Sequence, residues 1–259
     1  MRLIAFAFAC CVTAAAMAEK TALDAATQLA KQPPKLTLEA TAPQVLAACR
    51  DMLPKRPVKL SGALILRNRK GIVQKECDYR FVMRRSLEQT LLTIRLFERH
   101  TTNEIASVTV LRRGDEKPTI SLTANGKTQE VGSPLDCVMD TDVTWLDLSL
   151  DYLWWTNPRY EAEREGESVH GQKCSVILVD PPDAAAASGI KAVRLWADKK
   201  NGCLMQAETL DANSRPVRRL WGTRVKKFGE RWMANVLETE TLGSGRRTKI
   251  TVEELKELP

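Results

Sequence analysis

Few residues of this chain have the types and spacing that catalysis requires. His100 and His170 are the only histidines, neither lies in an HExxH motif, and no serine occupies a GxSxG motif. Pairs of carboxylates are frequent, for example Asp147 with Asp151, but at such spacings they usually cap or solvate a helix. Because a glycosidase pair needs no sequence motif, a hydrolase remains an alternative. The pattern predicts a protein that is not an enzyme.

The cysteines are the other residues that could do chemistry. Five follow the first 18 residues: Cys49, Cys77, Cys137, Cys174 and Cys203. None belongs to a CxxC motif, and Cys174 with His170 supplies too few ligands for zinc, so we expect no metal and no cofactor. Cys174 and Cys203 each begin a strand-like run, which predicts a disulfide between them; Cys77 with Cys137 is a second pairing.

The stretch DVTWLDLSLDYLWWTNP, residues 142–158, is dense in aromatic residues, which make up only 5% of the chain. Thr144 and Asp147 form a capping-box pattern, and Pro158 is expected to end the helix. Two apolar rows follow helical spacing, Trp145-Leu148-Tyr152-Trp155 and Leu146-Leu150-Leu153. They leave a narrow polar edge, Asp147 to Asp151, that should face outward. A helix so widely apolar must be covered on more than one side.

Most of the remaining chain has the pattern of antiparallel strands. Runs such as TLLTIRLFERH alternate, so that Leu92, Ile94 and Leu96 share an apolar face opposite Arg95, and turn residues separate successive runs. Helical spacing is confined to residues 20–31 and 43–53 ahead of the strands. A sheet of this many strands curls. The concave apolar trough that results is the place we predict for the aromatic helix.

The first 18 residues read as a cleaved secretory signal, with Arg2, an apolar run over residues 3–12 and a small-residue end at Ala18. Lipidation at Cys10 or Cys11 is the alternative. No later run approaches the roughly 20 apolar residues of a membrane helix. We therefore expect a protein of the bacterial periplasm.

The formal net charge is +7, and removal of the signal takes away Arg2 alone, which leaves 7 − 1 = +6. The basic residues are scattered among strand-like runs, as in RNRK, LRR and VKK. Such scatter is typical of the solvated outer face of a sheet. We therefore predict no nucleic-acid partner.

Residues 58–255 resemble the LolA-like superfamily, the outer-membrane lipoprotein-sorting proteins of bacteria. Five segments carry the resemblance: PVKLSGALILRNRKG, DTDVTWLDLSLDYLWW, ESVHGQKCSVILVDPP, KAVRLWADKKNG and the closing RWMANVLETET with GRRTKITVEEL. The resemblance implies a mostly β, α+β fold: an open, incomplete antiparallel β-barrel (half-barrel) with helices covering its concave apolar face. That face would bind lipid acyl chains.

We accordingly expect a signal peptide at 1–18, an amino-terminal helical segment at 19–57 that packs on the barrel, and the half-barrel at 58–259. The expected function is non-enzymatic binding of lipid or lipoprotein acyl chains by a monomer that meets inner- or outer-membrane envelope proteins. The alternative is an envelope sensor or protein-interaction module whose trough stays plugged. The predicted ligand-binding residues are Trp145, Leu148, Tyr152, Trp155, Trp196, Leu92, Ile94 and Leu96.

Overall fold

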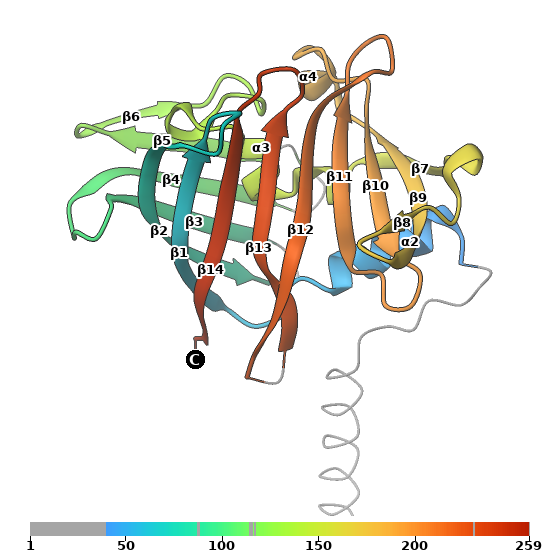
Figure 1. The fold of residues 1–259 in the computed structure, drawn as a ribbon, viewed down its shortest axis with the longest axis horizontal. Helices are drawn as coiled ribbons and strands as arrows, with labels where there is room; N and C mark the ends of the chain where they lie inside the picture. The colour runs from blue at the N-terminus through green and yellow to red at the C-terminus, as the bar shows by residue number, and fades with distance from the viewer. Residues whose placement is uncertain (1–39, 87–88, 114–115, 117, 230, 259) are drawn as a thin grey trace, which may run out of the picture. The chain divides into compact units, whose positions relative to one another are not determined.

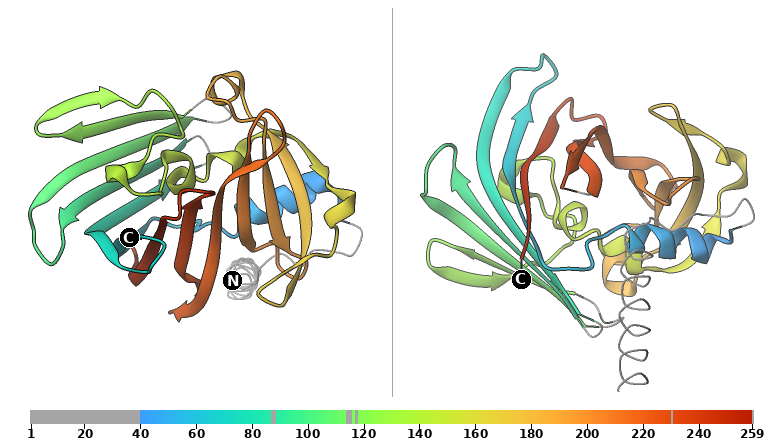
Figure 2. Two further views of the ribbon diagram at one scale, coloured as in Figure 1. Left: turned by 45° about the horizontal axis from the view of Figure 1, so that its top comes forward. Right: turned by 90° about the horizontal axis from the view of Figure 1, so that it is seen from below.

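The computed structural model describes residues 40–86, 89–113, 116, 118–229 and 231–258. This part of the chain forms one antiparallel sheet of 14 strands (Figure 1). The sheet curls without closing, and short helices lie inside the curve (Figure 2). The predicted half-barrel fold is therefore confirmed. The predicted signal and the helix predicted at residues 20–31 lie outside the described residues.

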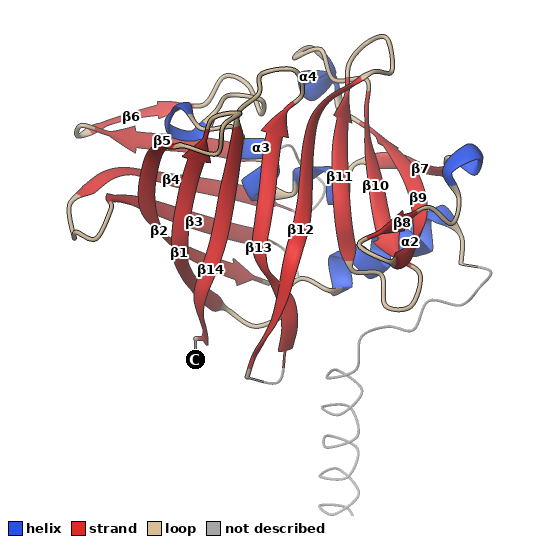
Figure 3. Cartoon of the chain, viewed as in Figure 1, coloured by secondary structure: helices blue, strands red, loops and turns tan. Residues whose placement is uncertain are grey.

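Short turns connect most of the strands (Figure 3). The strands are β1 Val58–Arg67, β2 Val73–Arg85, β3 Gln89–Glu98, β4 Glu104–Arg113, β5 Thr119–Ala124, β6 Lys127–Glu130, β7 Thr156–Tyr160, β8 Ser168–Val169, β9 Gln172–Asp180, β10 Ala192–Asp198, β11 Leu204–Leu210, β12 Pro216–Phe228, β13 Arg231–Thr241 and β14 Arg247–Glu257. The helical segments are α2 Ala42–Asp51, η1 Val138–Asp140, α3 Trp145–Ser149, η2 Asp151–Trp154, η3 Ala162–Arg164 and α4 Asp183–Ala186.

The sheet order is β6-β5-β4-β3-β2-β1-β14-β13-β12-β11-β10-β9-β7, with β8 paired to β9. The first and last strands therefore meet in the middle of the sheet, where Val58 pairs with Glu257. The strands β6 and β7 lie at opposite edges. The chain between them, residues 131–155, must therefore cross the whole sheet from one edge to the other.

The buried apolar side chains form two large clusters on the concave side. The first cluster joins α2 to β9, β10 and β11, and includes Val45, Leu46, Ile177 and Leu195. The second lies over β1 to β5 and includes the predicted row Leu92, Ile94 and Leu96. The helix predicted at residues 43–53 is present as α2, and its buried face contributes to the first cluster. No described helix has the length and apolar character needed to span a bilayer.

Gly62 of β1 permits a close approach between two backbones. A Cβ atom at this position would lie 1.7 Å from the Thr251 carbonyl oxygen of β14 and 3.2 Å from the Tyr79 ring. That carbonyl also accepts a hydrogen bond from the Tyr79 hydroxyl at 3.0 Å, beside a bulge in the pairing of β1 with β14. Only glycine fits where two backbones approach so closely. Gly62 lies in the segment PVKLSGALILRNRKG, one of the five that carry the resemblance.

We predict that Gly62→Ala lowers the free energy of unfolding by more than about 3 kcal/mol, because the added methyl group meets a backbone atom that cannot rotate away. Gly222→Ala in β12 is the matched control. Its Cβ would meet only Ala234 Cβ at 3.4 Å, so its stability should change by less than about 1 kcal/mol. Urea unfolding of both variants measures the difference, and equal midpoints would contradict the prediction.

Candidate functional site

The segment that crosses the concave face, residues 138–155, is called the plug below. Sequence spacing predicts one helix from Thr144 to Trp155, but the structure has α3, then Leu150 in a left-handed conformation (φ 51°, ψ 32°), then the 3-10 turn η2. Pro158 lies in β7 and does not end the helix. Leu150, at a positive φ, therefore ends α3 after five residues.

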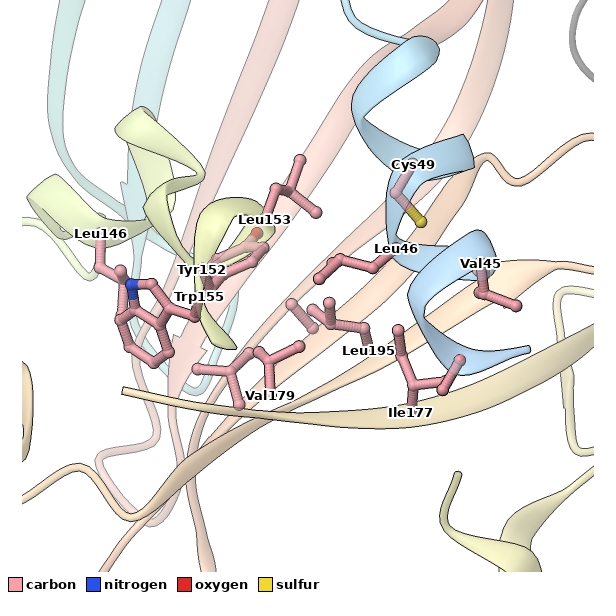
Figure 4. Packing of buried hydrophobic residues seen from close by; sticks show 14 of the residues in the cluster. Val45, Leu46, Cys49, Leu146, Tyr152, Leu153, Trp155, Ile177, Val179 and Leu195 are labelled. Atoms are coloured by element: carbon pink, nitrogen blue, oxygen red, sulfur yellow. The ribbon is translucent and has the colours of Figure 1, made fainter. Parts of the chain in front are cut away.

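The plug contributes side chains to both clusters, and α3 alone reaches both, since Leu146 lies in the cluster shared with α2. Trp145, together with Val138 and Val143, belongs to the cluster over β1 to β5. Tyr152, Leu153 and Trp155 belong to the cluster shared with α2, where they meet side chains of β9 and β10 (Figure 4). The plug therefore joins the two halves of the core, which is what its aromatic surface serves in this structure.

A polar strip crosses the concave face between the two clusters. Arg218 of β12, Thr239 of β13 and Thr248 of β14 form it, and all three are at most 7% exposed. Arg218 donates to Asp147 Oδ2 at 2.9 Å and to the Asp142 carbonyl. Thr239 Oγ1 donates to the same carbonyl at 3.1 Å, and the Asp142 N–H donates to Thr248 Oγ1 at 2.9 Å. Three strands thus hold the start of α3.

Asp147 has two roles at once. Its Oδ2 atom accepts from the N–H and the Oγ1 of Thr144, each at 2.9 Å, which confirms the predicted capping box. The same oxygen pairs with Arg218, and both side chains are only 8% exposed. The predicted outward position of the Asp147 edge is therefore wrong. The spacing could not reveal a partner 71 residues away.

A second buried ion pair holds the other half of the plug. Arg112 of β4 pairs with Asp151, and both side chains are about 90% buried, at 10% and 11% exposure. Asp151 Oδ2 also accepts from Trp155 Nε1 at 2.9 Å, and the Arg112 guanidinium lies 5.0 Å from the Trp154 ring centroid. The plug is therefore clamped by one Arg–Asp pair to each side of the sheet.

Beside Trp145 the plug leaves part of the concave face uncovered. A cavity of about 270 Å³ lies there, and its apolar wall includes Leu96, Ala106, Leu122 and Ala124 as well as the Trp145 ring. These side chains come from β3, β4, β5 and α3. At the edge of the cavity lie exposed residues of β6 and the following loop, among them Glu130 and Asp136. The arrangement can hold an apolar chain beneath a polar edge.

Seven of the eight predicted binding residues lie on the concave side, in three groups. Leu96 and Trp145 line the cavity, while Leu92, Ile94 and the half-buried Leu148 lie in the same cluster without lining it. Tyr152 and Trp155 belong to the other cluster.

Trp196 was assigned to the wrong face of the sheet. It packs with Cys174 and Val176 in a third, small cluster, whereas its neighbour Leu195 faces the concave side. Trp196 Nε1 donates to Glu167 Oε2 at 3.0 Å. Every residue of β10 is buried, but the sequence does carry a signal, because Trp196 shares its phase with the charged residues Arg194 and Asp198.

The predicted disulfide between Cys174 and Cys203 is also wrong, since all five described cysteines are free thiols. Cys174 of β9 pairs with Asp198 of β10, and the Asp198 N–H donates to the Cys203 carbonyl on the far side. The strand β10 therefore separates the Cα atoms of the two cysteines by about two strand spacings, roughly 10 Å, which is too far for a bridge. Cys77 and Cys137 are likewise unpaired as a disulfide. Burial raises the pKa of the Cys174 thiol to about 11.

Local sequence reasoning did not predict the two arginines. A signal is nevertheless present, because Arg218 and Leu220 share one face of β12, and Arg112 follows Val108 and Val110 on one face of β4. A cation in the apolar phase of a strand indicates a buried counterion. The identity of that counterion depends on the fold.

The fold is similar to that of LolA-like proteins, as the resemblance predicted. Solved structures with the same fold include a DUF1329 family protein from Desulfovibrio piger (TM-score 0.71, 15% identity, 83% of this chain and 91% of that chain). A candidate outer membrane lipoprotein-sorting protein domain from Vibrio parahaemolyticus is similar at TM-score 0.71 and 12% identity. The match covers 83% of this chain and 91% of that chain. A LolA superfamily protein from Nitrosomonas europaea is similar at TM-score 0.60 and 16% identity, over 85% and 96% of the two chains.

A family model described as "Uncharacterized protein" matches residues 122–257, which is more than half of the chain. The chain belongs to that family. The matched range contains the plug, the polar strip and strands β7 to β14. No curated protein matches the sequence.

We predict that Arg218→Ala lowers the free energy of unfolding by about 3–5 kcal/mol, because Asp147 would keep a buried charge without its partner. Arg159→Ala is the control. Arg159 pairs with Asp180 at 2.6 Å but is 49% exposed, so its loss should cost less than about 1 kcal/mol. Chemical unfolding of both variants tests this, and an equally small loss for Arg218→Ala would show that the polar strip does not hold the plug.

Proposed function

We propose that this protein is a periplasmic, non-enzymatic protein that binds acyl chains of lipids or lipoproteins on the concave face of its half-barrel. The observation that carries the proposal is the cavity of about 270 Å³ beside Trp145. It is the part of the concave apolar face that the plug leaves open. Its wall is aliphatic and aromatic, which suits a hydrocarbon chain.

The size of the cavity bears on the kind of ligand. Sites for small molecules usually measure about 300–1,000 Å³, so this cavity suits part of an acyl chain rather than a whole lipid. Each buried methylene contributes about 0.8 kcal/mol. A longer chain would gain more by extending into the apolar cluster over β1 to β5, where Trp145 now packs. The plug would then act as a lid that the ligand displaces.

The proposed role is that of a carrier. The name of the Vibrio parahaemolyticus neighbour refers to sorting of outer membrane lipoproteins, and the signal-like first 18 residues support export to the periplasm. A carrier must meet proteins of the inner or outer membrane that supply and accept its ligand. We further propose that residues 19–57 form the amino-terminal helical segment, residues 58–259 the half-barrel domain, and that the protein acts as a monomer.

A second candidate is an envelope sensor or interaction module whose trough remains plugged. The observation that favours it is the pair of buried clamps, Arg218 with Asp147 and Arg112 with Asp151. Breaking either clamp would expose an unpaired charge to an apolar environment. If the plug never leaves, the concave face is core and binding takes place elsewhere.

We predict that Ala124→Phe weakens binding of a fluorescent fatty acid at least tenfold, because the ring would fill the cavity that Ala124 lines. Thr123→Phe is the matched control. Thr123 is the preceding residue of β5, and its hydroxyl is hydrogen-bonded to Thr128 at 2.8 Å; successive strand residues point to opposite faces, so this variant should bind like the wild type. Failure of the wild type to bind at any concentration would exclude the acyl-binding proposal.

The lid and the fixed core differ in their response to Trp155→Ala. Loss of this buried ring should lower the free energy of unfolding by about 3–5 kcal/mol in either case. If the plug is a displaceable lid, fatty-acid affinity should stay equal or rise, because less is displaced. Trp196→Ala removes an equally buried ring from the other face, and should lower stability without raising affinity. If fatty-acid affinity rose in both variants, the cause would be a general loss of stability of the fold and not release of the plug.

A further inference from the structure

The strand β6 leaves one edge of the sheet open. Among the described strands it pairs only with β5, which it follows through an Asn-Gly turn with positive φ at both residues. The Val131 N–H donates to the Ile120 carbonyl at 2.9 Å, which fixes the alternation of this antiparallel ladder. The N–H and C=O groups of Thr128 and Glu130 therefore point away from β5. All four residues of β6 are exposed, so these groups face solvent.

The other edge strand, β7, is protected against pairing. Pro158 has no N–H group, and the register of β7 with β9 shifts between Thr156 and Arg159. The Tyr160 hydroxyl donates to the Ala40 carbonyl, and α2 packs against β7. Proline, a bulge and a covering segment are three devices that keep a sheet edge from pairing with another chain. Within the described residues, β6 has none of the three.

The edge of β6 is nevertheless short. Its four residues include Lys127, and both the short length and the lysine limit pairing. Thr128 and Glu130 offer a partner strand one N–H and one C=O group each. Each such bond contributes little in net terms, because water also bonds to these groups. A partner that pairs with β6 therefore needs a second contact with this protein.

The cavity beside Trp145 lies next to this edge and can supply the second contact. Gln129, Glu130 and Val131 are among its lining residues. Gln129 pairs with Leu122, whose side chain also lines the cavity, so both residues lie on the concave face. Alternate side chains of a strand added beside β6 would point to the same face. An apolar side chain among them would be directed toward the apolar wall of the cavity.

A second copy of this chain fits the edge less well than a peptide does. On the concave face its β6 would present Lys127 and Gln129, and neither side chain suits an apolar wall. An edge of four residues also provides far less than the roughly 1,000 Å² that a stable interface between two folded proteins buries. An extended peptide can instead carry an apolar residue at the position that faces the cavity.

We propose that the open edge of β6 binds an extended peptide segment of a partner protein as an additional strand. The peptide bonds to the backbone of Thr128 and Glu130, and one of its apolar side chains enters the mouth of the cavity. This inference goes beyond acyl binding, because the edge contacts involve backbone groups that an acyl chain does not use. Alternate side chains of the peptide then determine which partner binds.

The test is fluorescence polarisation with a labelled peptide, Lys-Thr-Val-Thr-Leu-Thr-Val-Thr-Lys, which is apolar on one face only. The wild type should bind this peptide. The same peptide with asparagine in place of each valine and leucine should bind at least about fivefold more weakly, because it has no apolar side chain for the cavity. Equal affinity for the two peptides, or no binding of either, would overturn the proposal.

Two variants at one position isolate the contribution of the edge. Thr128→Pro removes an outward N–H group but no bond to β5, and should weaken peptide binding at least about tenfold. Thr128→Ala is the matched control. It keeps that N–H group, and both variants lose the hydroxyl that meets Thr123 at 2.8 Å. Because main-chain bonds supply the affinity of an added strand, Thr128→Ala should bind the peptide within about twofold of the wild type.

Fatty-acid affinity should be the same in both variants as in the wild type, so a failure of the peptide test is distinguishable from a failure of acyl binding. Equal peptide affinity of Thr128→Pro and Thr128→Ala would contradict the role of the edge. A wild-type dimer in analytical ultracentrifugation that Thr128→Pro converts to monomers would also overturn the proposal, since the edge would then pair with a second copy. Equal circular dichroism and urea midpoints of the two variants would show that the fold is intact.

Discussion

The ion pair between Arg218 and Asp147 is the interaction on which the rest of this structure depends. Two charges that are each 8% exposed lose most of their hydration, and a single contact would not compensate for that loss. The surrounding hydrogen bonds do so: Thr144 donates to Asp147, and Arg218 also donates to Thr241 at 2.8 Å. Because this network spans β12 to β14, it fixes the plug at the middle of the sheet, where the first and last strands meet.

The position of the plug divides the concave face into two unequal halves. On the side of β9 to β11, α2 and the second half of the plug fill the space. On the side of β3 to β5, no described helix corresponding to α2 covers the sheet, and the plug reaches it through Trp145 and through the pair of Asp151 with Arg112. The cavity lies on this second side. One half of the sheet is thus covered by helical segments and forms the core. The other half is less covered and contains the cavity.

Sequence patterns predicted what depends on local chemistry. The alternation of Leu92, Ile94 and Leu96, the turn residues and the Thr144 capping box are properties of a few neighbouring residues, and the structure contains them all. The pairing of β1 with β14 joins Ala63 to Thr251, 188 residues apart, and no local pattern encodes it. The buried pairs of the plug depend on that topology. Because no local pattern reveals a partner at such a distance, the sequence alone predicts a solvated acidic edge for the plug.

The two edges of the sheet differ in how firmly they are held. Behind β9 and β10, Arg194 joins Glu161 and Glu208 by hydrogen bonds of 2.5–2.8 Å, and Trp196 packs under the chain that leads into β8. At the other edge, β6 has four residues, all exposed, and among the described strands it pairs only with β5. Segments with few buried contacts open at the lowest free-energy cost. Any opening of the trough should therefore begin at β6 and the loop that follows it, beside the cavity, while the edge that carries α2 and β7 stays closed.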